Sequence, residues 1–457
     1  MIDYKKIINN QKKYFLTRAT YSIDFRINQL RKLKYLIEKN ESNICNALMK
    51  DLGKCEFESY VSEISFVISE LNYIINNLRT WCKDNKVKTP ITSLPGKSYI
   101  VKEPYGSVLV IGPWNYPFHL IFSPIIGAIA AGNCVVVKPS ELSPNISALI
   151  TNIINKNFNP CYIYSAEGGI EETTSLLSLK WDYIFFTGSV NVGKVVMEAA
   201  SKNLTPLTLE LGGKSPCIVD KDSDLLVSAK RIVWGKFFNT GQTCIAPDYL
   251  FIHKDIVKKF IPLLIKYIKN FYGENAINSS HYGRIINDKH FDRLTSYFKD
   301  GNIIYGGETS KENLYISPTL IVGTKTNSPL MSEEIFGPIL PILQFSNLNE
   351  IIYFINNRPK PLALYYFSKN ENNISKIIKE TSSGSVCINE TLSQINTHYL
   401  PFGGVGTSGM GKYHGKWSYE TFTHHKSVMK RSFLLDLKIK YPPYNLPAKN
   451  IRKFIEY

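Results

Sequence analysis

The sequence of 457 residues lacks the features that mark several classes of protein. No apolar run approaches the roughly 20 residues that span a bilayer, and the N-terminus has no apolar signal-peptide core. We therefore expect a cytoplasmic protein without a transmembrane anchor. The sequence also lacks internal repeats and low-complexity tracts, which argues against a repeat architecture and against long disordered segments.

The eight cysteines form no CxxC pair and no Cys/His cluster with the spacing of metal ligands. We therefore expect no metal site. Reduced thiols in an intracellular enzyme explain this pattern best.

The formal net charge is +16, which is compatible with an acidic partner such as nucleic acid or an anionic membrane surface. The lysines, however, are scattered along the chain among many Asn, Ile and Tyr residues. This distribution favours a solvated basic surface, and we expect no nucleic-acid partner. Peripheral membrane contact by the basic C-terminal tail stays open.

The length predicts more than one hydrophobic core. Apolar residues recur at helical spacing from residue 3 to about residue 79, which predicts a helical scaffold without catalytic residues. The following segment, to residue 100, is polar and interrupted by proline. It predicts a hairpin that projects from the body.

Strand and helix patterns alternate over residues 107–219. Short, wholly apolar strands between helices predict a parallel sheet covered on both faces, and such sheets bind nucleotides at the carboxyl ends of their strands. The alternation starts again after Gly213, which predicts a second domain of the same kind. The fold class is therefore α/β, with two doubly wound parallel sheets and a boundary near residues 210–213.

One cysteine, Cys244, lies in a loop of small and polar residues, 239–249, between a helix-like and a strand-like segment. A reactive thiol must be reachable and easily ionised, and a loop flanked by glycine at a sheet edge favours both properties. On this stretch alone, a buried structural thiol is the better interpretation, because most free cysteines are of that kind. The other motifs must decide between the two.

Two strand ends in the first sheet are candidate cofactor contacts. Lys138 ends one strand and Glu141 follows it, so that a carboxylate at the strand tip can accept hydrogen bonds from a ribose diol. Gly188 and Ser189 lie in a strand-to-helix turn, with Gly193 in the helix, where backbone N–H groups can meet a pyrophosphate. Each of these patterns is weak alone, since a Glu after Pro is usually a surface residue.

A GxGxxG pattern at Gly404, Gly406 and Gly409 is similar to a dinucleotide-binding fingerprint. No apolar strand leads into it and no long helix follows it directly, although that motif requires both. The pattern therefore predicts a tight turn.

Six motifs, in this order, resemble those of the NAD(P)-dependent aldehyde dehydrogenases. They are PWNYP (113–117), KPSE (138–141), FTGS (186–189), LELGGKSP (209–216), GQTC (241–244) and EEIFGP (333–338). The resemblance covers about residues 80–425. GQTCIAPDY, the segment LPFGGVGTSGMGKYHG and the short N-terminus resemble the class 3, or fatty aldehyde dehydrogenase, branch. Membrane-bound members of that branch carry an apolar C-terminal anchor, which the ending RKFIEY does not resemble.

The resemblance implies an aldehyde dehydrogenase-like fold, with a small β element for oligomerisation added to the two sheets. Class 3 relatives form dimers, so a homodimer is expected. The implied division is a cofactor-binding domain with the N-terminal scaffold (1–79 and 102–209), a catalytic domain (210–392), the oligomerisation element (80–101 and 393–425) and a basic tail (426–457).

The resemblance also implies the catalytic roles. Cys244 is the nucleophile that attacks the aldehyde carbon to form a thiohemiacetal. The side-chain amide of Asn115 and the backbone N–H of Cys244 stabilise the oxyanion. Hydride transfer leaves a thioester, and Glu210 is the general base for its hydrolysis. The alternative for Glu210 is a strand-end acid paired with a surface lysine.

The remaining implied contacts concern the cofactor and the substrate. Glu334 and Phe336 resemble the contacts to the nicotinamide ribose and ring, and Glu334 is also a candidate for proton transfer. Glu141 near the ribose 2′-position favours NAD over NADP by charge repulsion, although class 3 relatives often accept NADP as well. Three residues are candidates for lining the substrate entrance: Tyr116, Tyr413 and His414. A role in packing is an equal alternative for each of them.

The predicted reaction is oxidation of a medium- or long-chain aliphatic, or an aromatic, aldehyde to its carboxylic acid. One alternative is a relative that passes the thioester to coenzyme A. Such relatives tend to lack a base at the position of Glu210, which argues against this alternative. The other is a non-catalytic binding protein on the same fold, for which the net charge of +16 is the only support.

Overall fold

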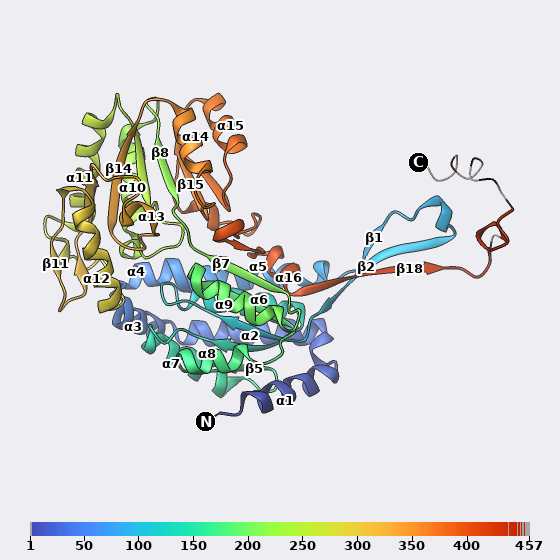
Figure 1. Ribbon diagram of the computed structural model, residues 1–457. Helices are drawn as coiled ribbons and strands as arrows, with labels where there is room; N and C mark the ends of the chain where they lie inside the picture. The colour runs from blue at the N-terminus through green and yellow to red at the C-terminus, as the bar shows by residue number, and fades with distance from the viewer. Residues whose placement is uncertain (1, 437, 446, 448, 450–451, 453–457) are drawn as a thin grey trace.

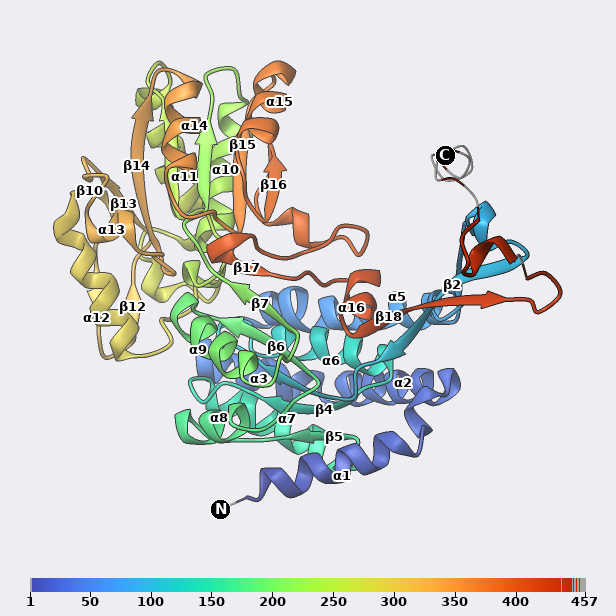
Figure 2. The ribbon, with the colours of Figure 1, turned by 45° about the vertical axis from the view of Figure 1, so that its right-hand side comes forward.

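Two sheets of mainly parallel strands, with helices packed against them, and a projecting antiparallel arm make up the structure (Figure 1). The computed structural model describes residues 2–436, 438–445, 447, 449 and 452. In both ribbon views the sheet of the later strands lies above the sheet of the earlier strands, and the arm extends away from both (Figure 2). The predicted fold class is confirmed.

The first sheet has the strand order β17-β7-β6-β3-β4-β5. All its pairs are parallel except the edge pair of β17 and β7. Both β3 and β4 are apolar and wholly buried, as parallel strands with two covered faces should be. The strands are β3 (Ser107–Ile111), β4 (Cys134–Lys138), β5 (Ile163–Ser165), β6 (Tyr183–Gly188), β7 (Leu207–Leu211) and β17 (Gly409–Met410).

Helix α6 (His119–Ala131) is the centre of this half of the molecule, because every one of its residues is buried. It packs against β3 and β4 on one side and against α2 and α5 on the other. The other helices here are α1 (Tyr4–Leu16), α2 (Ile23–Lys39), α3 (Glu41–Leu52), α4 (Glu56–Ser59), a π-helical turn (Tyr60–Ile64), α5 (Ser65–Trp81), α7 (Pro144–Asn157), α8 (Ile170–Leu177) and α9 (Val190–Ser201). The N-terminal helices therefore enclose the first core.

The second sheet has the order β10-β13-β14-β9-β8-β15-β16. Its strands are β8 (Pro216–Val219), β9 (Tyr249–His253), β10 (Asn302–Tyr305), β13 (Thr319–Val322), β14 (Ile339–Phe345), β15 (Ala363–Phe367) and β16 (Ser385–Ile388). The helices are α10 (Leu225–Phe237), α11 (Val257–Tyr272), α12 (Asp288–Ser296), α13 (Pro329–Ser332), α14 (Leu348–Asn356) and α15 (Glu371–Glu380). A two-stranded ribbon, β11 (Thr309–Ser310) and β12 (Tyr315–Ile316), lies beside it.

Two edge strands, β17 and β10, run antiparallel to their neighbours, whereas the other pairs of both sheets are parallel. Gly409 explains the first edge: it pairs with Glu210, its φ is 137°, and a Cβ atom there would lie 2.1 Å from the Leu209 carbonyl oxygen. Only glycine allows so close an approach. The GxGxxG pattern forms a turn around Gly406–Ser408, as predicted, and not a helix entrance.

The arm is a three-stranded sheet in the order β1-β2-β18, formed by β1 (Asn85–Val87), β2 (Gly96–Pro104) and β18 (Thr423–Arg431). Strands β1 and β2 form the predicted hairpin. Strand β18 pairs with β2 over its whole length and follows the short helix α16 (Lys416–Thr421). The prediction that a tail begins at residue 426 is therefore wrong, because residues 426–431 belong to this strand. The rest of that segment lies partly outside the described residues.

Three further observations concern only the residues that the structure describes. No helix among them is long and apolar enough to cross a membrane. No group of three or more His, Cys, Asp or Glu side chains among them could hold a metal ion. All eight cysteines are unpaired.

Candidate active site

A cavity of about 400 Å³ lies between the two sheets and collects most of the predicted site residues. Strands of the first sheet end on one side of it, and the loop that carries Cys244 lies on the other. The predicted residues that line it are Asn115, Tyr116, Gly188, Ser189, Glu210, Cys244, Glu334, Phe336, Tyr413 and His414. Residues far apart in the sequence therefore meet in one place.

The Cys244 loop follows α10 and makes a sharp turn before β9. Asn239, Thr240 and Gly241 have φ values of 50°, 55° and 72°, so three consecutive residues adopt the left-handed region. Two of them are not glycine, which makes the turn costly unless its surroundings hold it. A Cβ atom at Gly241 would lie 2.3 Å from the Gly337 carbonyl oxygen, so the turn is packed closely against the segment that precedes β14.

The Cys244 thiol is partly buried, and its burial raises its pKa to about 12. The carboxylates of Glu334 and Glu210 add to this rise, while the backbone N–H groups of Cys244 and Ile245 oppose it. Burial therefore opposes ionisation of this thiol in the protein alone, because a desolvated anion beside two carboxylates is unfavourable. Ionisation needs a positive charge or a proton acceptor nearby.

Glu210 lies near the end of β7 and is 3% exposed. Neither of its carboxylate oxygens has a hydrogen-bond partner among the described residues. Burial raises its pKa well above the usual range of a glutamate. The alternative of an acid paired with a surface lysine is thus wrong: Glu210 is a desolvated acid that faces the cavity, where it can hold a proton or accept one.

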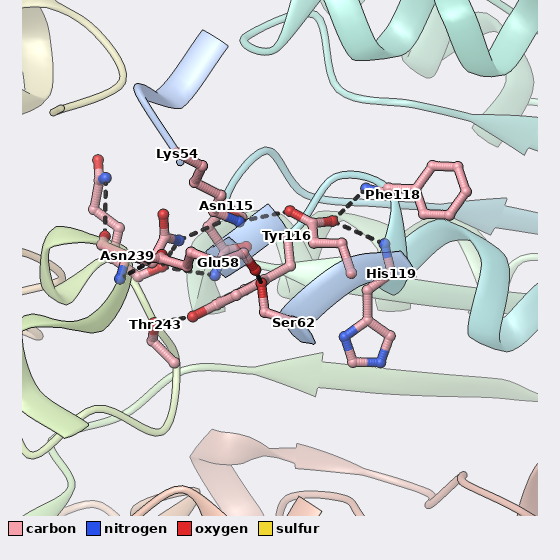
Figure 3. A network of polar contacts seen from close by, with 11 residues as sticks. Lys54, Glu58, Ser62, Asn115, Tyr116, Phe118, His119, Asn239 and Thr243 are labelled. Carbon is pink, nitrogen blue, oxygen red and sulfur yellow. Dashed lines mark hydrogen bonds and ion pairs between the residues drawn. The ribbon is translucent and has the colours of Figure 1, made fainter. Parts of the chain in front are cut away.

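Asn115 connects the first sheet to the Cys244 loop (Figure 3). Its side-chain amide donates to the Gln242 carbonyl oxygen at 2.9 Å, and the Asn239 amide donates to the Asn115 carbonyl oxygen at 2.9 Å. An amide nitrogen carries two hydrogens, so the second N–H of Asn115 is available to the cavity. Tyr116 packs beside it, and its hydroxyl is hydrogen-bonded to the Thr243 hydroxyl at 2.6 Å.

Glu334 lies over the turn that follows β7. A Cβ atom at Gly212 would lie 2.0 Å from a carboxylate oxygen of Glu334, so glycine at this position leaves free the space that the carboxylate occupies. Burial raises the pKa of Glu334 to about 8, with a further rise from Asp248 and an opposing effect of the Gly213 N–H and Lys214. Glu334 also lines a neighbouring cavity of about 220 Å³, which extends this groove along Lys214 and Arg358.

Three predicted cofactor residues do not line the central cavity. Lys138 is buried at the end of β4, with its Nζ atom 3.3 Å from an oxygen of the exposed Glu141 carboxylate. Gly193 faces Leu211 instead, and a Cβ atom there would lie 2.7 Å from that side chain. Gly193 therefore allows α9 to pack closely on β7.

The polar groups at this edge fit a dinucleotide. The Ser189 hydroxyl accepts the Val192 N–H at the start of α9, and this helix terminus faces the cavity. Helix N-termini at the carboxyl ends of parallel strands bind phosphates. The exposed Glu141 carboxylate follows β4, two strands along the sheet from β6, and is able to accept hydrogen bonds from a ribose. Glu334 and Phe336 line the same cavity as Cys244, so an oxidised nicotinamide held there would supply a hydride acceptor and a positive charge near the thiol.

Most of the apolar side chains that line the cavity and form its apolar wall were not predicted from the sequence. The side chains concerned are Val61, Phe66, Trp114, Leu120, Trp234, Phe238, Leu392, Ile395 and Phe402. They come from five segments, so no spacing in the sequence links them. One weak pattern existed: Trp234 and Phe238 are four residues apart at the end of α10, just before the Cys244 loop, and Trp234 stays 39% exposed.

Comparison with known proteins identifies the class of protein. The model of the aldehyde dehydrogenase family matches residues 2–428, and the chain belongs to this family. The protein is therefore an aldehyde dehydrogenase, an oxidoreductase that uses NAD(P) to oxidise aldehydes to acids.

Its relatives belong to the class 3 branch, as predicted. The chain is 49% identical to the 4,4'-diaponeurosporen-aldehyde dehydrogenase of Staphylococcus aureus (strain NCTC 8325 / PS 47), over 98% of both chains. It is 48% identical to the dimeric NADP-preferring aldehyde dehydrogenase of Rattus norvegicus, over 97% of this chain and 98% of the relative. A solved structure of the substrate-bound state of Staphylococcus aureus AldH has a TM-score of 0.97 at 49% identity, over 99% of this chain and 100% of that chain.

The electrostatics of the thiol give a first prediction. In the cofactor-free protein, alkylation of Cys244 by iodoacetamide should be slow near pH 7 and should accelerate as pH rises, because the thiolate is the nucleophile. Glu334→Gln should shift this curve to lower pH, because it removes a carboxylate that raises the thiol pKa. The measurement is the rate of alkylation against pH, with the Cys244→Ala rate subtracted for the other cysteines.

Glu333→Gln is the matched control for this prediction. Glu333 is the neighbouring residue, but its carboxylate accepts the Tyr297 hydroxyl at 2.7 Å and does not line the cavity. Its curve should coincide with that of the wild type. An unshifted curve for Glu334→Gln would contradict the placement of that carboxylate beside the thiol.

Proposed function

We propose that this aldehyde dehydrogenase oxidises a medium- or long-chain aliphatic, or an aromatic, aldehyde, with Cys244 as the nucleophile. The observation that supports this most directly is that Cys244, Glu210 and Asn115 line one cavity, together with Glu334, Phe336 and a set of apolar side chains. We assign cofactor binding to residues 1–79 and 102–209, and catalysis to residues 210–392.

In this proposal the aldehyde carbon is attacked by the Cys244 thiolate. The oxygen becomes an anion that accepts hydrogen bonds from the free N–H of the Asn115 amide and from the backbone N–H of Cys244. Collapse of the thiohemiacetal releases a hydride to the nicotinamide and leaves a thioester on Cys244. Glu210 then takes a proton from water, which attacks the thioester and releases the acid.

The burial of Glu210 suits this role. A carboxylate without hydrogen-bond partners, in a site that raises its pKa, is a stronger base than an exposed one. The same feature argues against transfer to coenzyme A, because a base directed at water favours hydrolysis. Glu334, whose pKa lies near 8, is our candidate for taking the thiol proton.

The apolar wall supports a hydrophobic substrate. The cavity is bordered by Trp234, Phe238, Ile395 and Phe402, so an alkyl chain or ring gains by leaving water there. The relative from Staphylococcus aureus is named as a 4,4'-diaponeurosporen-aldehyde dehydrogenase. Tyr116, Tyr413 and His414 line the same cavity and are assigned to substrate contacts.

For the cofactor we propose a preference for NAD, with NADP accepted as well. The Glu141 carboxylate at the tip of β4 repels a 2′-phosphate, but it is paired with Lys138 and exposed, which weakens that repulsion. The relative from Rattus norvegicus is named as NADP-preferring, which agrees with a weak barrier at this position.

The proposed catalytic roles predict that two variants lose activity at different steps of the reaction. Cys244→Ser should abolish production of reduced cofactor. Glu210→Gln should give one equivalent of reduced cofactor per site and then stall, because the thioester is no longer hydrolysed. Stopped-flow absorbance followed by steady-state turnover measures both, with Glu198→Gln on the exposed face of α9 as an unaffected control. Full turnover by Glu210→Gln would overturn its role as the base.

The apolar wall predicts the response to chain length. For straight-chain aldehydes, kcat/KM should rise by about fourfold per added methylene until the cavity is filled, since each buried methylene contributes about 0.8 kcal/mol. Phe238→Ala should flatten this rise. The assay is reduced-cofactor formation with NAD and with NADP, with the higher kcat/KM for NAD. A gain in rate on adding coenzyme A, with an acyl-CoA product, would favour the acylating alternative.

We also propose that the protein is a cytoplasmic homodimer that pairs through the arm. Exposed apolar side chains gather on the arm, among them Val87, Ile91 and Met429, and a second copy would cover them. The relative from Rattus norvegicus is named as dimeric. The unpaired cysteines agree with a reducing compartment.

The dimer gives a fourth prediction. Light scattering at micromolar concentration should give twice the chain mass of 52.0 kDa. The double variant Ile91→Glu and Met429→Glu should shift the protein to monomer, because a buried charge opposes association. Leu204→Glu is the control, since Leu204 is 91% exposed and lies outside the arm. A monomeric wild type would contradict the proposal.

A further inference from the structure

The N-terminal helices place three charged side chains beneath the catalytic loop. Lys54 follows α3, Glu58 lies in α4 and Glu63 lies in the π-helical turn, and all three are buried, with exposures of 1%, 7% and 0%. Charged residues are almost never so buried without a specific partner. The sequence predicts only a helical scaffold without catalytic residues in this N-terminal segment.

Lys54 contacts the backbone of Asn115. Its Nζ atom donates to the Asn115 carbonyl oxygen at 3.0 Å and forms an ion pair with Glu63 at 2.5 Å. The same Nζ atom lies 4.1 Å from the centre of the Tyr116 ring. The carbonyl oxygen of Asn115 thus accepts hydrogen bonds from Lys54 and from Asn239 together (Figure 3).

Glu63 completes the attachment of this segment to the first sheet. Its second oxygen accepts the backbone N–H groups of Phe118 and His119 at 2.9 and 3.0 Å, at the start of α6. The residues on both sides of Asn115 are therefore fixed: its own carbonyl group by Lys54, and the chain that follows by Glu63. The π-helical turn that carries Glu63 is a rare conformation that often occurs at functional sites.

Glu58 contacts the other half of the site. It accepts the backbone N–H of Asn239 at 2.9 Å, at the first of the three left-handed residues before Cys244. Burial raises the pKa of Glu58 to about 7, with an opposing effect of Lys54 and of the Asn239 N–H. A side chain of α4 thus stabilises the strained turn of the Cys244 loop through this hydrogen bond.

We propose that Lys54 and Glu58 are positioning residues of the active site, which hold the Asn115 amide and the Cys244 loop in the relative geometry that oxyanion stabilisation needs. This inference rests on the roles of Asn115 and Cys244 proposed above. Neither residue touches the substrate. Each acts through one partner: Lys54 through the Asn115 carbonyl group and Glu58 through the Asn239 N–H.

Stability alone does not explain these residues. Replacement of a buried ion pair by apolar side chains of similar size is often neutral or stabilising, because the cost of desolvating the charges disappears. The rate of catalysis, by contrast, depends strongly on precise placement: a displacement of about 1 Å at a reacting centre can lower the rate by about a hundredfold. Hydrogen bonds with Lys54, Glu58 and Glu63 hold the Asn115 segment and the Cys244 loop, which belong to different halves of the molecule.

The test compares variants by kcat, by KM for the cofactor and by thermal midpoint. Lys54→Met and Glu58→Leu should each lower kcat by at least about tenfold, with KM for the cofactor unchanged, because only the reacting geometry is disturbed. Glu58→Gln keeps an oxygen acceptor for the Asn239 N–H and should retain most of the activity. Such recovery is expected only if the hydrogen bond, and not the volume of the side chain, is the relevant feature.

Gln11→Met is the control for general destabilisation. Gln11 is wholly buried in α1 and donates to the Val135 carbonyl oxygen at 3.0 Å, away from the cavity. It should lower the thermal midpoint and leave kcat unchanged. If Lys54→Met does not fold, Lys54→Arg, which keeps the charge and moves the donors, should give a folded protein with lowered kcat.

Unchanged kcat in Lys54→Met and Glu58→Leu, with a thermal midpoint lowered as in Gln11→Met, would overturn the positioning role. Equal losses in Glu58→Gln and Glu58→Leu would also overturn it. Cys244→Ala, assayed beside them, separates failure of this inference from failure of the proposed function. If Cys244→Ala is active, the assignment of Cys244 as the nucleophile is wrong. If Cys244→Ala is inactive and the Lys54 and Glu58 variants are fully active, only the positioning role is refuted.

Discussion

The hydrogen bond between the Asn115 amide and the Gln242 carbonyl oxygen holds together the two halves of the candidate active site. It joins a residue that follows β3 of the first sheet to the loop that carries Cys244 in the second half of the molecule. A site built between two sheets has no shared backbone to fix its geometry. Side chains must do so, and amides suit this purpose because they donate and accept at fixed angles.

Desolvation is the second organising feature. The Cys244 thiol, Glu210 and Glu334 share one cavity, and burial raises the pKa of each. In the protein alone, burial therefore favours the protonated form of each of these groups. In the proposed mechanism, the positive charge of an oxidised nicotinamide beside them would lower the cost of forming a thiolate, which would couple activation of the nucleophile to cofactor binding.

Much of this protein could be predicted from its sequence, because the relevant residues lie in short, local patterns. Apolar runs such as that of β3 identify buried parallel strands, and six ordered motifs identify the family. The antiparallel edge strands could not be predicted in this way. The two-residue strand β17 exists only because Gly409 allows close approach to β7, and that contact spans about half of the chain.

By itself, the sequence determined the class of enzyme, the candidate nucleophile and the candidate base, since each lies within a contiguous motif. Only the tertiary structure decided how these groups behave. Burial set the direction of the pKa changes at Cys244 and Glu210, and the apolar wall came from segments with no common spacing. The same holds for Lys54 and Glu58: their partners lie 61 and 181 residues away, and such distances leave no trace in a local pattern.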